Sequence, residues 1–122
     1  MKVLLVNGSS RANGCTGVAL KEVERALNEE GIETELVFIG NAPIADCTAC
    51  GFCEEHDKCV FDDLVNTFVE KAREADGFVF GSPVYYAHPS GRLLSFMDRV
   101  FYSGGDALRF KPAAAVLSAR RA

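Results

Sequence analysis

Residues 2–16 read KVLLVNGSSRANGCT, and this stretch decides the fold. It opens with a short apolar run, Lys2 to Val6, which Asn7-Gly8 closes. A run of this length is too short for a helix and indicates a buried strand. Residues 16–30 then repeat apolar side chains with helical spacing, and Gly31 provides a C-cap. The apolar positions of this helix are Val18, Val23, Ala26 and Leu27.

Strand and helix patterns alternate along the rest of the chain. Further strands are expected over residues 34–39, 77–81 and 113–117, and a helix over residues 90–102. Another helix is expected to start at Asp62, as its cap, and to carry apolar residues as far as Ala72. Alternation of this kind means parallel strands with helices on both faces. The sequence therefore predicts one domain over residues 1–122, a doubly wound α/β sandwich of three layers.

The fourth strand is expected to end only a few residues before Ala122. Its apolar run, residues 113–117, belongs inside a sheet, because a bare apolar edge strand promotes aggregation. We therefore expect a fold that is cut short after the fourth strand, with its C-terminal part missing.

Composition and charge exclude several classes of protein. Seventeen acidic and 13 basic residues give a net charge of -4, which argues against a protein that binds nucleic acid or anionic membranes. The first apolar run is too short for a signal peptide or a membrane span, so we expect a cytoplasmic protein. In that compartment, clustered cysteines indicate metal or redox chemistry rather than disulfides.

The loop after the first strand, residues 8–16, has the composition of an anion site. Glycines, small hydroxyl residues and Arg11 precede a helix, whose first N–H groups and dipole favour a phosphate. The spacing matches neither a Walker loop nor a dinucleotide fingerprint. An ordinary strand-to-helix turn with a serine cap is the structural alternative.

A second segment, Gly81-Ser82-Pro83-Val84-Tyr85-Tyr86, follows the third strand. In open α/β sheets, ligands bind where the strand order reverses, which here lies between the first and third strands. A phosphate at residues 8–16 and a flat ring at residues 81–86 would then share one crevice. Alone, a tyrosine pair after a strand can be ordinary packing.

Together with a third segment, these two resemble the NADPH-dependent FMN reductases and the related iron–sulfur flavoproteins, which have a flavodoxin-like fold. The matching segments are Asn7 to Arg11 with Thr16, Gly81 to Tyr86, and Phe96-Met97-Asp98-Arg99. By resemblance, the FMN phosphate would be held by Ser9, Arg11, Asn13, Cys15 and Thr16. The isoalloxazine ring would lie against Pro83, Val84, Tyr85 and Tyr86, and its other edge would approach Ser118, Ala119, Arg120 and Arg121. Cys15 stands where the family often has asparagine, and the family continues well past Ala122.

The segment between residues 40 and 60 is a long loop without periodicity, and it contains Cys47, Cys50, Cys53 and Cys59. Three cysteines spaced by two residues and a fourth nearby can ligate an iron–sulfur cluster. The spacing resembles the compact motif of the iron–sulfur flavoproteins, which implies a 4Fe–4S cluster. Zinc, a disulfide and four free thiols that only shape a loop remain alternatives.

The sequence thus predicts a flavoprotein oxidoreductase that passes electrons from NAD(P)H through FMN to an acceptor, with no catalytic side chain assigned. An FMN-binding electron carrier without NAD(P)H activity, or a metal-binding structural module, are the alternatives. The predicted helix over residues 90–102 is apolar nearly all round, which favours a homodimer or a tetramer built from dimers. His88 is expected to be a structural residue at the entry of that helix.

Overall fold

A computed structural model describes residues 1–121. The sheet contains four parallel strands in the order β2-β1-β3-β5, and a two-residue strand, β4, pairs antiparallel with β3. The strands are β1 (Lys2–Asn7), β2 (Glu33–Phe38), β3 (Gly77–Tyr85), β4 (His88–Pro89) and β5 (Ala113–Ser118). The helices are α1 (Cys15–Glu29), α2 (Phe52–His56), α3 (Leu64–Glu74) and α4 (Gly91–Leu108).

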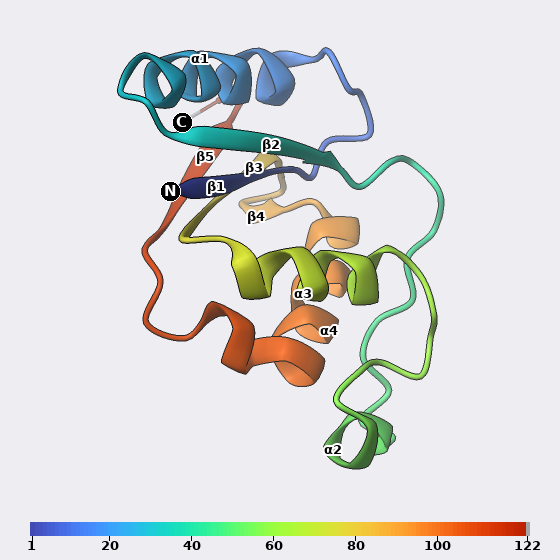
Figure 1. Cartoon of the computed structure of the whole chain (residues 1–122). Coiled ribbons are helices and arrows are strands. Elements are labelled where there is room, and N and C mark those ends of the chain that lie inside the picture. Colours follow the sequence, from blue (N-terminus) through green and yellow to red (C-terminus); the bar gives the residue numbers. More distant parts are fainter. Residues whose placement is uncertain (122) are drawn as a thin grey trace.

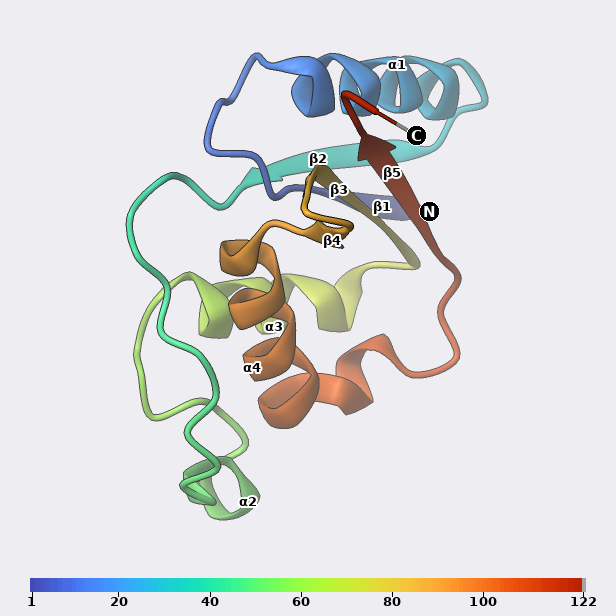
Figure 2. The ribbon, with the colours of Figure 1, turned by 180° about the vertical axis from the view of Figure 1, so that it is seen from behind.

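Helices cover both faces of this sheet, which confirms the three-layer α/β sandwich (Figure 1). Helix α1 packs on one face, where Leu20 meets Leu5 and Val79 in a small apolar cluster. Helices α3 and α4 pack on the other face over a larger core that includes Phe68, Phe78 and Phe96. Strand β5 lies beside β3 at the edge of the sheet, and most of its side chains are exposed (Figure 2).

Several expected boundaries are wrong. Asp63, not Asp62, caps α3, because its carboxylate accepts the N–H of Val65. Strand β3 continues beyond Gly81 to Tyr85, because it pairs with β5 along most of its length. Helix α4 runs six residues beyond the expected end at Tyr102, through a kink at Gly104.

Two elements were missed altogether. The loop between residues 40 and 60 contains the short helix α2, which projects away from the sheet in both views (Figures 1 and 2). His88, which lies two residues before Ser90, the cap of α4, belongs to β4 and pairs with Tyr85. The intervening residues Tyr86 and Ala87 both have positive φ angles, of 49° and 67°. Positive φ at both central positions is typical of a tight hairpin turn and is strained in residues other than glycine.

No helix within residues 1–121 is both long enough and apolar enough to span a bilayer.

Candidate functional site

Strands β1 and β3 are neighbours in the sheet, and the chain leaves their carboxyl ends on opposite faces. The loop after β1 leads to α1, while β3 leads through β4 to α4. A cavity lies at this switch point, where open α/β sheets bind ligands. Its lining residues are Ser9, Ser10, Arg11, Gly14, Cys15, Thr16, Pro83, Val84, Tyr85, Ser118 and Arg120.

The loop after β1 is shaped by its own side chains. Buried Asn7 accepts the N–H of Ser9 at 3.0 Å through Oδ1 and donates from Nδ2 to the carbonyl of Ala12 at 3.2 Å. The hydroxyl of Ser9 accepts the N–H of Arg11 at 3.1 Å. These bonds stabilise the conformation of the loop from within the protein.

Glycine at position 8 lets this loop lie against the end of β3. The N–H of Gly8 donates to the carbonyl of Gly81 at 2.8 Å. A Cβ at position 8 would lie 2.9 Å from both that oxygen and the Cβ of Leu93, so a side chain there would push the loop away.

The cavity favours an anion. Helix α1 begins at Cys15 without a side-chain cap and without an acidic residue in its first turn, so its N-terminal N–H groups keep their positive field. Arg11 and Arg120 add positive charge, and none of the lining residues within the described chain is acidic. The arrangement fits a phosphate at the α1 end of the cavity.

Pro83, Val84 and Tyr85 line the other side of the cavity, and their side chains are largely apolar. Tyr85 is half exposed and ends β3 just before the strained Tyr86–Ala87 turn. A planar ring fits against such an apolar surface.

The structure brings most of the predicted cofactor residues together, with four exceptions. Asn13 points instead toward Lys21, whose ammonium donates to its Oδ1 at 3.0 Å, and Tyr86 is 99% exposed. Ala119 and Arg121 also lie outside the lining. Thr16 lines the cavity, but its hydroxyl is already within 3.1 Å of the Ser118 hydroxyl. Ser10 and Gly14, which the resemblance did not assign, are part of the lining.

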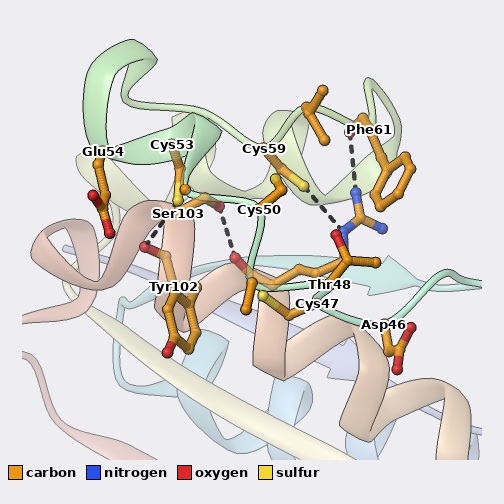
Figure 3. Close-up of a pocket in the computed structure, with 14 residues that line it drawn as sticks. Asp46, Cys47, Thr48, Cys50, Cys53, Glu54, Cys59, Phe61, Tyr102 and Ser103 are labelled. Carbon is orange, nitrogen blue, oxygen red and sulfur yellow. Dashed lines mark hydrogen bonds between the residues drawn. The ribbon is translucent and has the colours of Figure 1, made fainter.

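A second cavity lies between α4 and the loop that contains the cysteines. All four predicted ligands, Cys47, Cys50, Cys53 and Cys59, line it (Figure 3). The thiol of Cys53 donates to the carbonyl of Tyr102 at 3.7 Å, and the sulfur of Cys59 accepts the Nε–H of Arg99 at 3.2 Å. All five cysteines of the chain are free thiols, and Cys15 is remote from this cavity, at the start of α1.

The donor set of the second cavity is four cysteine thiols, which both a four-iron cluster and a zinc ion can take as ligands. No three histidine, cysteine or acidic side chains among residues 1–121 lie close enough to hold one metal ion. Zinc needs its ligands around one centre, about 2.3 Å from each sulfur. A four-iron cluster instead binds each thiolate at a different iron, so its ligands stand farther apart.

Arg99 is the residue of this cavity to which sequence reasoning gave no role of its own. Its side chain is 1% exposed, and its guanidinium pairs with both carboxylate oxygens of Asp63, at 2.7 and 2.8 Å. Burial by itself lowers the pKa of Arg99, but hydrogen bonds to Asp63 and to the Cys59 sulfur outweigh burial and raise the pKa above its usual value. Position 99 lies on the same buried face of α4 as Phe96 and Val100. A charged residue among apolar positions of one helix face was the sequence pattern that could have pointed to Arg99.

Comparison with known proteins places this geometry in a family. The model of the NADPH-dependent FMN reductases matches residues 1–122. The chain belongs to this family. The resemblance inferred from the residues is thereby confirmed, together with the flavodoxin-like fold.

Two curated relatives of this chain are iron-sulfur flavoproteins. The protein of Methanocaldococcus jannaschii is 40% identical over 99 residues, which cover 81% of this chain and 51% of the relative. The protein of Methanosarcina thermophila is 39% identical over 100 residues, with 81% and 52% covered. The chain thus spans about half the length of the curated relatives it matches.

Solved structures support the same fold. RosB, in a crystal structure with a bound 8-demethyl-8-formylriboflavin-5'-phosphate intermediate, superposes with a TM-score of 0.73 at 21% identity. The match covers 98% of this chain and 52% of RosB. At this level of identity, the likeness concerns the fold alone.

Proposed function

We propose that this FMN reductase family member binds FMN in the cavity at the switch point and acts as an NAD(P)H-dependent oxidoreductase. The observation that carries the proposal is that the loop before α1, which contains Arg11, and the apolar residues Pro83, Val84 and Tyr85 line one cavity. These are the two surfaces that a phosphorylated flavin requires. Among relatives, a Staphylococcus saprophyticus protein, 28% identical over 112 residues, is an FMN-dependent NADPH-azoreductase, which supports the same class of reaction.

In this proposal the protein binds and orients FMN. The bound FMN supplies the redox chemistry by accepting a hydride and releasing electrons to an acceptor. The loop from Ser9 to Thr16 and the side chain of Arg11 hold the phosphate. Pro83, Val84 and Tyr85 hold the ring against the end of β3, and Arg120 approaches from β5. No side chain is assigned an acid–base role, because hydride transfer to a flavin needs none.

Addition of NADPH to FMN-loaded protein in the absence of oxygen tests this function. An oxidoreductase bleaches the flavin absorbance as the cofactor is reduced. An FMN-binding electron carrier without NAD(P)H activity keeps its yellow colour, and this outcome would replace the proposal with the second hypothesis. Protein that binds no flavin at all would contradict both.

We propose further that Cys47, Cys50, Cys53 and Cys59 ligate a 4Fe–4S cluster. The support is that all four thiols line one cavity, in a loop whose backbone departs from ordinary conformations. Ala49 and Asp57 have positive φ angles of 54° and 53°, and such strain persists where surrounding structure over-determines it. A cytoplasmic location goes with this proposal, because thiols stay reduced there.

Iron analysis of anaerobically purified protein tests the cluster. The proposal predicts about four irons per chain. Replacement of Cys47, Cys50, Cys53 or Cys59 by serine should remove most of this iron. Cys15→Ser is the matched control, because Cys15 lies outside the cavity, and should leave the iron content unchanged. Iron-free protein with normal FMN binding would contradict the cluster and leave the flavin proposal intact.

A further inference from the structure

Arg99 is a buried charge that the flavin cavity does not use. It lies in the middle of α4, and its neighbours on the buried stripe are apolar. Burial of a guanidinium is costly unless its N–H groups are satisfied. Here they donate to Asp63, to the carbonyls of Ala45 and Phe61 at 3.3 and 3.0 Å, and to the sulfur of Cys59.

These contacts draw two separate segments, one at Ala45 and one from Cys59 to Asp63, to one side chain. Ala45 precedes the first cluster cysteine, Phe61 follows the last one, and Asp63 caps α3. Arg99 thus anchors both ends of the cysteine loop to the rigid sandwich. All of these partners satisfy N–H groups of the buried guanidinium, and Cys59 is the one among them that is also a proposed cluster ligand.

Cys59 is held more firmly than the other cluster cysteines. The side chain of Asn66 on α3 makes two hydrogen bonds with the backbone of Cys59. It accepts the Cys59 N–H at 2.8 Å and donates to the Cys59 carbonyl at 3.0 Å. Arg99 adds the bond to the sulfur itself, at 3.2 Å. Among the other three thiols of residues 1–121, the one hydrogen bond is that of Cys53 to Tyr102.

A positive donor beside a ligating sulfur has a defined electrostatic effect. Reduction adds a negative charge to an iron–sulfur cluster, and hydrogen bonds to its sulfurs stabilise that charge and raise the reduction potential. Because Arg99 is 1% exposed, water screens this effect little. Asp63 opposes it, since its carboxylate neutralises part of the guanidinium charge.

We propose that Arg99 is a positioning residue for Cys59 and raises the reduction potential of the cluster, while Asp63 moderates this effect. This inference rests on the cluster proposed above. It makes the potential depend on a side chain of α4 that ligates nothing, and it predicts opposite shifts for the two members of one ion pair.

Anaerobic redox titration of the cluster in two variants tests the inference. Arg99→Lys keeps a positive charge that can pair with Asp63. It lacks the planar guanidinium, whose several N–H groups donate to Asp63 and to Cys59 at the same time. The equilibrium between reduced and oxidised cluster should shift on the order of tenfold toward the oxidised form, a potential more negative by about 59 mV for one electron. Asp63→Asn keeps an Oδ1 that can cap α3 and accept one N–H of Arg99, but it replaces the second carboxylate oxygen with an NH2 group. It also removes the opposing charge, so the potential should become more positive.

Arg73→Lys is the matched control, because Arg73 pairs with Asp106 on the surface and touches no cysteine. It should leave the potential unchanged. The FMN potential, read in the same titration, should be the same in all variants, because neither Arg99 nor Asp63 lines the flavin cavity.

Opposite shifts of the reduction potential in Arg99→Lys and Asp63→Asn support the inference. A general loss of structure would not shift the potential in opposite directions in the two variants. If Arg99→Lys does not fold, Asp63→Asn decides alone: an unchanged or more negative potential overturns the inference. Iron-loaded variants with unshifted potentials overturn the role of Arg99 and leave the cluster standing. Iron-free native protein overturns the cluster and the inference together.

Discussion

The hydroxyl of Ser90 donates a hydrogen bond of 2.7 Å to the carbonyl of Gly8, although 82 residues separate them in the chain. The same hydroxyl caps α4 by accepting the N–H of Leu93, and the N–H of Ser90 donates to the hydroxyl of Ser82. Ser90 therefore joins the ends of β1 and β3 to the start of α4. This buried junction lies directly behind the proposed phosphate loop.

We expect Ser90→Ala to weaken both the fold and the flavin site. The substitution leaves the buried Gly8 carbonyl without its partner and removes the cap of α4, so the free energy of unfolding should fall by about 1–3 kcal/mol. FMN affinity should fall with it, because the loop loses its anchor. Urea unfolding and FMN titration measure the two effects.

The control for this variant is Ser95→Ala on the same helix, where alanine suits a helical position and the change in stability should stay within about 0.5 kcal/mol. If Ser90→Ala behaves like Ser95→Ala, the junction does not stabilise the site.

Adjacent glycines in α4 should respond very differently to alanine. A Cβ at Gly104 would lie 2.3 Å from a methyl carbon of Val69 on α3, whereas a Cβ at Gly105 meets nothing within 4 Å. Gly104→Ala should therefore cost about 1–3 kcal/mol through overpacking. Gly105→Ala should be neutral or stabilising, because alanine is the better helix former. Thermal unfolding of the two variants tests the packing of α3 on α4, and equal midpoints would contradict it.

The sequence was sufficient to predict the α/β sandwich because α1 shows helical periodicity and β1 and β3 are short apolar runs. It was insufficient where long-range contacts decide the outcome. Strand β3 extends past Gly81 because β5 pairs with it, and α4 extends past Tyr102 because Gly104 allows a close approach to Val69. Neither partner is local in sequence, so no local pattern could predict the boundary.

For the candidate sites, too, the sequence was sufficient where local patterns decide the structure and insufficient where long-range contacts do. The loop after β1 and the segment after β3 converge because the topology brings their strands together, and the sequence predicted that topology. Arg99, in contrast, reads as an ordinary charge in the sequence. Its role depends on Asp63 and Cys59, which approach it from 36 and 40 residues away.

Helix α4 also bears on assembly, which stays a prediction. The chain buries Leu93, Phe96 and Val100 but leaves Phe101 48% exposed, with Leu94 and Tyr102 also exposed. We expect this apolar surface to lie in a homodimer interface, or in a tetramer built from dimers. Sedimentation of the native protein at micromolar concentration should show the assembly, and Phe101→Glu should dissociate it.

Phe110→Glu is the control for this substitution, because Phe110 is exposed outside α4, and it should leave the assembly unchanged. An assembly that persists in Phe101→Glu would exclude α4 from the interface. A monomeric native protein at this concentration would contradict the predicted assembly.

In the proposed function, the cavity between the β1–α1 loop and the end of β3 recognises the phosphate of FMN. Parallel titrations of FMN and riboflavin into native protein, Arg11→Ala and Arg25→Ala test it most directly. Arg11 lines the cavity, whereas Arg25 pairs with Glu22 and Glu29 on the far part of α1 and serves as the control. Loss of a charge-assisted hydrogen bond should weaken FMN binding roughly tenfold to a hundredfold in Arg11→Ala, with little change for riboflavin and none in Arg25→Ala. Equal losses of FMN and riboflavin in Arg11→Ala, or equal affinities of the native protein for the two ligands, would contradict the account.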